Sequence, residues 1–138
     1  MCKFAAVVVV VILTAASCFQ LALAMGLPAS QLSWGGQFTG ALPEAYRWAS
    51  LVAIAPLAIA AWVVMSRADI MRPGSKSIAI EIAAWIFTGY LSLNTLGNLL
   101  SKSSLERLIM TPVSLVLVVC FTLVACSRQQ QAGPPNRR

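Results

Sequence analysis

The chain has 138 residues, of which 59% are hydrophobic and 10% charged, and its mean hydropathy is +0.80. Soluble domains are about half apolar and about a quarter charged, so this composition excludes a water-soluble globular protein and predicts a membrane protein. The net charge of +6 comes from basic residues that flank the apolar runs and form no stripe with exposed aromatic residues. This arrangement fits orientation in a membrane and argues against nucleic-acid binding.

Four long apolar runs predict an all-α fold, a membrane-embedded bundle of four transmembrane helices with short loops. A helix rises about 1.5 Å per residue, so each run is long enough to cross, or nearly cross, the hydrocarbon core. We expect one transmembrane domain over residues 1–126 and a disordered cytoplasmic tail over residues 127–138, because this tail is polar, basic and contains prolines. The predicted spans cover about residues 4–24, 46–66, 78–100 and 106–126.

The first apolar run, residues 4–24, has two interpretations. Ala22-Leu23-Ala24 resembles the small-x-small motif at which signal peptides are cleaved. However, the run is longer than the roughly 7–15 residues usual for the core of a signal peptide, and a retained helix gives an even number of spans. We therefore favour retention of this helix, with cleavage as the alternative.

Local motifs predict where the second and fourth helices begin. Pro43-Glu44 marks the start of the second helix, because proline suits the first helical positions and a carboxylate interacts favourably with the helix dipole. Pro56 lies inside the second span and predicts a kink there. Ser103-x-x-Glu106 matches a capping box, which predicts that the fourth helix begins near Ser104.

Aromatic residues near the ends of the spans are expected to anchor the protein at the membrane–water interfaces. For the loop segment Trp34-Gly35-Gly36, the alternative is a ligand entrance. The expected anchors are Trp34, Tyr46, Trp48 and Trp62.

The distribution of basic residues predicts the orientation. If both termini lie inside, the inner side carries seven basic residues: Lys3, Arg67, Arg72, Lys76, Arg128, Arg137 and Arg138. The outer side then carries only three: Arg47, Lys102 and Arg107. The positive-inside rule therefore predicts cytoplasmic termini. Abundant alanine and an excess of arginine over lysine are typical of GC-rich bacteria, which indicates the bacterial cytoplasmic (inner) membrane.

The third span, residues 78–100, is unusually polar, and we expect the other helices to pack around it. On a helical wheel, one face carries Glu81, Trp85, Thr88, Ser92 and Thr95. A roughly opposite face carries Tyr90, Asn94 and Asn98 at spacings of four residues. Such side chains belong against protein rather than lipid. The candidate intramembrane polar face therefore consists of Glu81, Tyr90, Asn94 and Asn98.

Glu81 is the one acidic residue inside an apolar run, and an intramembrane carboxylate is by default a candidate functional residue. It lies only one turn inside the helix, however. The alternative is a structural role, in which Glu81 pairs with Arg72 or Lys76 at the cytoplasmic interface and interacts with the helix dipole.

The residues expected of an enzyme site are missing from the sequence. There is no histidine, the four cysteines form no CxxC pair, and no second intramembrane carboxylate is available to pair with Glu81. We therefore expect a protein that is not an enzyme and has no cofactor, no metal site and no catalytic residue.

Three segments carry a resemblance to known sequences. They are Trp34-Gly35-Gly36, Leu42 to Trp48, and Leu93 to Asn98 followed by Ser101 and Glu106-Arg107. Through these segments the chain resembles a family of uncharacterised small bacterial integral membrane proteins with four spans, over most of residues 30–125. The resemblance implies a four-span membrane fold and assigns no activity.

We expect a structural or accessory protein that binds other helices. Its partners would be the lipid bilayer and either another copy of the chain or another membrane protein. The alternative is a small homo-oligomeric transporter or channel with a polar path along the third helix. The chain is short for a monomeric transporter and has no obvious inverted repeat.

Overall fold

The computed structural model describes residues 2–71 and 77–127, and these residues form an all-α bundle without β-strands. The four helices are α1 (Cys2–Ala24), α2 (Glu44–Arg67), α3 (Ile78–Leu99) and α4 (Ser104–Cys126). Two short 3-10 helices, η1 (Ser30–Leu32) and η2 (Trp34–Gly36), lie between α1 and α2. Each α-helix is long and apolar enough to cross a membrane, which confirms the predicted fold class. Apart from Ser127, the predicted disordered tail lies outside the described residues.

The helix starts follow the local motifs. Pro43 directly precedes α2, and Glu44 is its first residue. Ser103 caps α4, because its Oγ accepts a hydrogen bond from the backbone N–H of Glu106 at 3.3 Å. Both helices that contain an internal proline, Pro56 in α2 and Pro112 in α4, continue through it as single helices.

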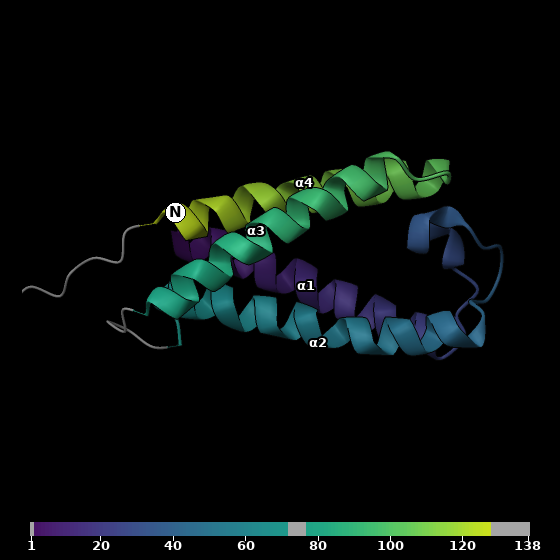
Figure 1. The fold of residues 1–138 in the computed structure, drawn as a ribbon, viewed down its shortest axis with the longest axis horizontal. Helices are drawn as coiled ribbons and strands as arrows, with labels where there is room; N and C mark the ends of the chain where they lie inside the picture. Colours follow the sequence, from purple (N-terminus) through teal and green to yellow (C-terminus); the bar gives the residue numbers. More distant parts are fainter. Residues whose placement is uncertain (1, 72–76, 128–138) are drawn as a thin grey trace, which may run out of the picture.

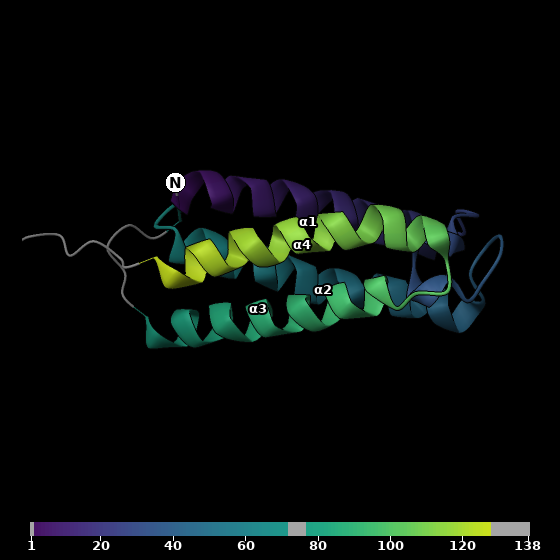
Figure 2. The ribbon, with the colours of Figure 1, turned by 90° about the horizontal axis from the view of Figure 1, so that it is seen from above.

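The bundle consists of two antiparallel hairpins, α1–α2 and α3–α4, that lie lengthwise against each other (Figures 1 and 2). Helix α1 packs against α4 as well as α2, and α2 also contacts α3. The thiol of Cys2 donates a hydrogen bond to Ser127 Oγ at 3.2 Å, so the two chain ends described lie together. We call this the terminal end of the bundle, and the opposite end, which carries residues 25–43 and 100–103, the loop end.

Helix α3 is not the helix around which the others pack, so that prediction is wrong. It lies at the edge of the bundle, mainly against α4, and only Ala84, Thr88 and Leu91 are buried along it (Figure 2). The reason is local. The hydroxyls of Thr88, Ser92 and Thr95 donate to backbone carbonyls four residues earlier, at 2.8–2.9 Å. These groups are satisfied within their own helix and need no neighbouring helix.

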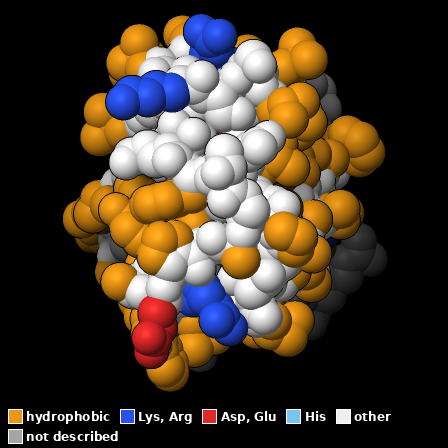
Figure 3. Space-filling model, turned by 90° about the vertical axis from the view of Figure 1, so that its right-hand side faces the viewer, with side chains coloured by type: hydrophobic (Ala, Val, Ile, Leu, Met, Phe, Trp, Pro, Cys, Tyr) orange, Lys and Arg blue, Asp and Glu red, His pale blue; other side chains and the backbone are white. Residues whose placement is uncertain are grey.

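The polarity of the buried residues changes from one end of the bundle to the other. An apolar core occupies the terminal half, where all four helices contribute buried side chains; these include Ala6, Val9, Val64, Ala84, Phe121 and Val124. Toward the loop end, buried polar residues become frequent: Ser30, Ser33, Ser50, Ser101, Glu106 and Ser114. Seen from the loop end, backbone and side chains that are neither hydrophobic nor charged run down the middle, charged groups lie toward the top and the bottom, and hydrophobic side chains lie along the sides (Figure 3). This distribution fits a protein whose sides face lipid and whose end faces water.

Candidate functional site

The four predicted polar residues of α3 do not form one site. Glu81 lies near the terminal end, whereas Asn98 lies near the loop end and contacts α4. Tyr90 and Asn94 are exposed on the outside of the bundle. The spacing of four residues predicts one stripe, but the stripe turns gradually around the helix axis, so its last member forms hydrogen bonds with α4 while Tyr90 and Asn94 are exposed.

Asn98 joins α3 to α4. Its side-chain amide donates hydrogen bonds to the backbone carbonyl of Met110 at 3.4 Å and to Ser114 Oγ at 3.3 Å. Ser114 is buried and in turn donates to the carbonyl of Thr111 at 3.0 Å. Asn98 therefore holds the second hairpin together, which is a structural role inside this chain.

Tyr90 and Asn94 belong to an open surface that we call the α3 outer face. All of its members are exposed: Gly89, Tyr90, Leu93, Asn94 and Gly97. Neither the Tyr90 hydroxyl nor the Asn94 amide forms a hydrogen bond with residues 2–71 or 77–127. A Cβ placed on Gly89 or Gly97 would meet no atom within 4 Å, so this face lies open to a neighbour. Helix faces with small residues permit close approach of a second helix in a membrane.

Within the described residues, the basic neighbour of Glu81 is Arg67. The Glu81 carboxylate lies 3.9 Å from Nη2 of Arg67, and Arg72 and Lys76 lie outside the described residues. The same Nη2 donates to the carbonyl of Ala125 at 3.0 Å, in the last turn of α4. Arg67 is buried whereas the Glu81 side chain is 53% exposed. Arg67 thus links α2 to the end of α4, and Glu81 is its solvent-side neighbour.

The predicted anchors divide into two pairs. Trp48 and Trp62 are exposed near opposite ends of α2, and their role as interfacial anchors stays a prediction. Trp34 and Tyr46 pack edge to face, with ring centroids 5.4 Å apart. The indole N–H of Trp34 donates to Ser50 Oγ at 3.1 Å, and Ser50 is fully buried. Trp34 therefore holds the loop onto α2.

A buried carboxylate organises the loop end. Glu106, in the first turn of α4, is only 4% exposed. Its Oε1 accepts the backbone N–H of Gly35 at 3.3 Å, and its Oε2 accepts a hydrogen bond from the Ser101 hydroxyl. Ser101 Oγ also accepts the backbone N–H of Ser103 at 3.1 Å. The capping box is therefore only half formed. Ser103 Oγ accepts the N–H of Glu106, but the N–H of Ser103 donates to Ser101 Oγ instead of to the Glu106 carboxylate, which binds the loop.

The backbone conformation of residues 34–36 brings the N–H of Gly35 to the Glu106 carboxylate. Trp34, Gly35 and Gly36 all have positive φ, at 55°, 72° and 63°. Glycine adopts this region at little cost. At Gly36 a Cβ would also lie 2.2 Å from Cβ of Ser103, so the loop and the α3–α4 link approach too closely for a side chain. The carbonyl of Gly35 accepts the N–H of Lys102 at 3.3 Å and completes the contact.

The loop-end contacts were not among the site residues predicted from the sequence. Both segments were singled out in the sequence, Trp34-Gly35-Gly36 as an interfacial loop and Ser103-x-x-Glu106 as a cap, but nothing in their spacing pairs residues 71 positions apart. The arrangement is a hydrogen-bonded closure of the bundle end.

Within residues 2–71 and 77–127, no group of three or more His, Cys, Asp or Glu side chains is placed to hold a metal ion.

No family model, curated protein or solved structure matches the chain. The fold itself therefore defines the class: an all-α bundle of four helices, each able to span a membrane, which fits an integral membrane protein.

Proposed function

We propose that this chain is a membrane protein without enzymatic activity that binds a transmembrane helix of another protein through the α3 outer face, in a structural or accessory role. The observation that carries this proposal is the exposure of Tyr90 and Asn94 on a span without hydrogen-bond partners in the described part of the chain. Asn94 lies about 8 Å, and Tyr90 about 14 Å, from the loop-end terminus of α3. Both positions fall within the hydrocarbon layer, where acyl chains cannot satisfy an amide or a hydroxyl.

The shape of the face also favours a helix as the partner. Gly89, Leu93 and Gly97 follow each other at spacings of four residues, beside Tyr90 and Asn94. The two glycines leave shallow depressions on either side of Leu93, into which side chains of a second helix can pack. Tyr90 and Asn94 both donate and accept hydrogen bonds, so they can pair with polar side chains of either kind.

The same residues support helix binding over the alternative, a homo-oligomeric transporter or channel with a polar path along α3. A path must offer free polar groups across about 30 Å of hydrocarbon. Tyr90 and Asn94 lie only about 6 Å apart along the helix. The hydroxyls of Thr88, Ser92 and Thr95 already donate to backbone carbonyls of α3, so they add no free donors to such a path.

Photo-crosslinking in cells tests the proposal. A photoreactive amino acid at Leu93 should crosslink the full-length chain to a different membrane protein, and Asn94→Leu should reduce this yield severalfold. The matched control is the same amino acid at Val116, which is exposed on α4. Crosslinks to lipid alone from Leu93 would contradict the proposal. Crosslinks to a second copy would replace the accessory role with self-association and favour the homo-oligomeric alternative.

We infer further that the chain lies in the bacterial inner membrane with both termini in the cytoplasm. This rests on the seven-to-three excess of basic residues, and it is supported by the proximity of Cys2 and Ser127 at one end of the bundle. Reporter fusions after Arg138 and at the exposed Gln37 of the loop should give opposite signals. A reporter after Arg138 that is active outside the cytoplasm would overturn this orientation.

A further inference from the structure

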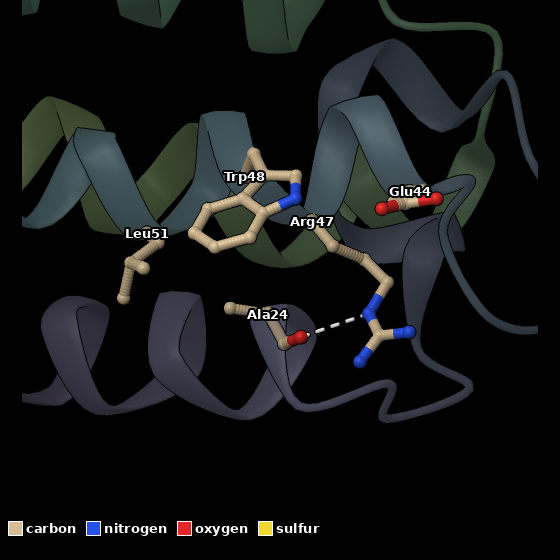
Figure 4. Close-up of a pocket in the computed structure, with 5 residues that line it drawn as sticks. All are labelled: Ala24, Glu44, Arg47, Trp48 and Leu51. Carbon is tan, nitrogen blue, oxygen red and sulfur yellow. Dashed lines mark hydrogen bonds between the residues drawn. The ribbon is translucent and has the colours of Figure 1, made fainter.

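A cleft of about 380 Å³ opens on the side of the bundle where α1 ends and α2 begins. Its lining comes from both helices: Ala24, Glu44, Arg47, Trp48 and Leu51 (Figure 4). The cleft lies near the loop end, next to the end of one span and the beginning of another, which is the depth of a membrane–water interface. It is separate from both the α3 outer face and the contacts of Glu106.

Arg47 is a half-buried cation held in place at this cleft. Its Nε donates to the carbonyl of Ala24 at 2.8 Å and so caps the last turn of α1 (Figure 4). A guanidinium carries five N–H donors. The four on its two Nη atoms form no hydrogen bond with residues 2–71 or 77–127. One hydrogen bond therefore fixes the guanidinium, and the four N–H donors on its Nη atoms remain available. Their planar arrangement suits the oxygens of a phosphate.

Glu44 supplies an anion to the same cleft. It lies three residues before Arg47 on α2, is exposed, and forms no ion pair with Arg47 within 4.0 Å. The cleft therefore presents one positive and one negative group that do not neutralise each other directly. A ligand with both charges complements this pair, whereas a purely anionic ligand would meet repulsion from Glu44.

The apolar part of the cleft continues along α2 from the charged pair into the span. Trp48 is 63% exposed and Leu51 is 42% exposed, and Leu51 lies one turn further from the loop end than Arg47. Charged groups, an aromatic ring and an aliphatic side chain thus follow one another from the interface inward. A phospholipid has the same order of headgroup, glycerol backbone and acyl chain.

We propose that this cleft binds the headgroup of a zwitterionic aminophospholipid, phosphatidylethanolamine. Arg47 donates to the lipid phosphate, and Glu44 accepts from the ammonium group. Trp48 covers the glycerol region, and Leu51 contacts the start of an acyl chain. Bound lipid in this position also covers the exposed junction of α1 and α2.

Native mass spectrometry of the full chain in detergent tests this site, with phosphatidylethanolamine and phosphatidylglycerol added separately. The wild type should bind phosphatidylethanolamine more tightly than phosphatidylglycerol. Glu44→Gln should lower that preference about two- to fivefold, since an exposed ion pair contributes modestly. Arg47→Ala should weaken binding of both lipids about tenfold or more, because it removes charge-assisted hydrogen bonds.

Two controls keep the result interpretable. Arg107→Ala removes an exposed cation near the same end of the bundle and should leave both affinities unchanged. Arg47→Ala also removes the cap of α1, whereas Glu44→Gln breaks no hydrogen bond or ion pair within the described residues, so a change in lipid preference in Glu44→Gln does not come from a lost contact of the bundle. Equal affinity for the two lipids in both the wild type and Glu44→Gln would overturn the proposal, as would lipid binding insensitive to Arg47→Ala.

Discussion

The backbone N–H of Gly35 donates a hydrogen bond to Oε1 of Glu106 at 3.3 Å. This bond joins the loop between the first two helices to the first turn of the last one. At this end of the bundle, buried serines lie beside a few buried apolar side chains such as Leu23 and Leu42. Closure of the loop end therefore depends on a few polar contacts, whereas the terminal end is held by a continuous apolar core. The two ends should respond differently to substitution.

Removal of the Glu106 carboxylate should destabilise the protein. Glu106→Ala leaves the N–H of Gly35 and the hydroxyl of Ser101 without their acceptor, and we expect a loss of about 2–4 kcal/mol in the free energy of unfolding. Glu106→Gln retains one acceptor oxygen and should cost about 1 kcal/mol. Thermal unfolding in detergent measures both. Arg107→Ala, at the exposed neighbouring residue, is the control, and a loss equal to that of Glu106→Ala would contradict the role given to the carboxylate.

Gly36 and Gly40 form a matched pair for testing the approach of the loop to α4. Both have positive φ, 63° and 86°, so alanine strains the backbone at either position. Only at Gly36 would the new Cβ clash, at 2.2 Å from Ser103 Cβ. We expect Gly36→Ala to lower the free energy of unfolding by about 1–3 kcal/mol more than Gly40→Ala does. Equal unfolding temperatures for the two variants would show that the loop does not pack on Ser103.

The sequence was sufficient to predict the helices and where they begin. Hydropathy and length define spans, and the motifs at Pro43-Glu44 and Ser103 act through bonds and dipoles within a few residues. These are local properties, so no knowledge of the neighbours is required. The observed helices begin and end within two residues of the predicted spans.

The sequence was not sufficient to predict which helices are neighbours. Helical periodicity places Tyr90, Asn94 and Asn98 near one another, but it cannot show that α4 reaches only Asn98. The polarity of α3 suggested a central position because hydroxyls in a span were expected to need partners. Thr88, Ser92 and Thr95 instead donate to their own backbone, which removes that need. The contact between Gly35 and Glu106 is equally non-local.

Asn98 and Ser114 should be energetically coupled. Asn98→Leu removes two hydrogen bonds to α4, and we expect the free energy of unfolding to fall by about 1 kcal/mol. A double-mutant cycle with Ser114→Ala should give a coupling of about 0.6 kcal/mol, the average for hydrogen bonds between membrane helices. Asn94→Leu is the control, because Asn94 is exposed and its side chain forms no hydrogen bond within residues 2–71 and 77–127, and it should leave the stability of the isolated chain nearly unchanged. Additive effects at Asn98 and Ser114 would rule out their bond.

Arg67 should matter far more to stability than Glu81. Glu81→Gln removes a partner that is half exposed and 3.9 Å away, and we expect a cost below about 1 kcal/mol. Arg67→Ala removes a buried side chain and its bond to the carbonyl of Ala125, and should cost about 2–3 kcal/mol. Unfolding temperatures, measured beside a growth phenotype, separate structure from function. Loss of the phenotype in Glu81→Gln at normal stability would restore the intramembrane carboxylate as a functional residue.

The first helix should remain attached in the mature protein. Helix α1 packs against both α2 and α4, and Ala6, Val9 and Leu23 on it are completely buried. Cleavage after Ala24 would remove this helix and expose the apolar surfaces of α2 and α4 that it covers. It would also remove the carbonyl of Ala24 that Arg47 caps. The intact mass of the protein purified from membranes should therefore show that α1 is retained, and a chain that begins at Met25 would show that only three spans remain.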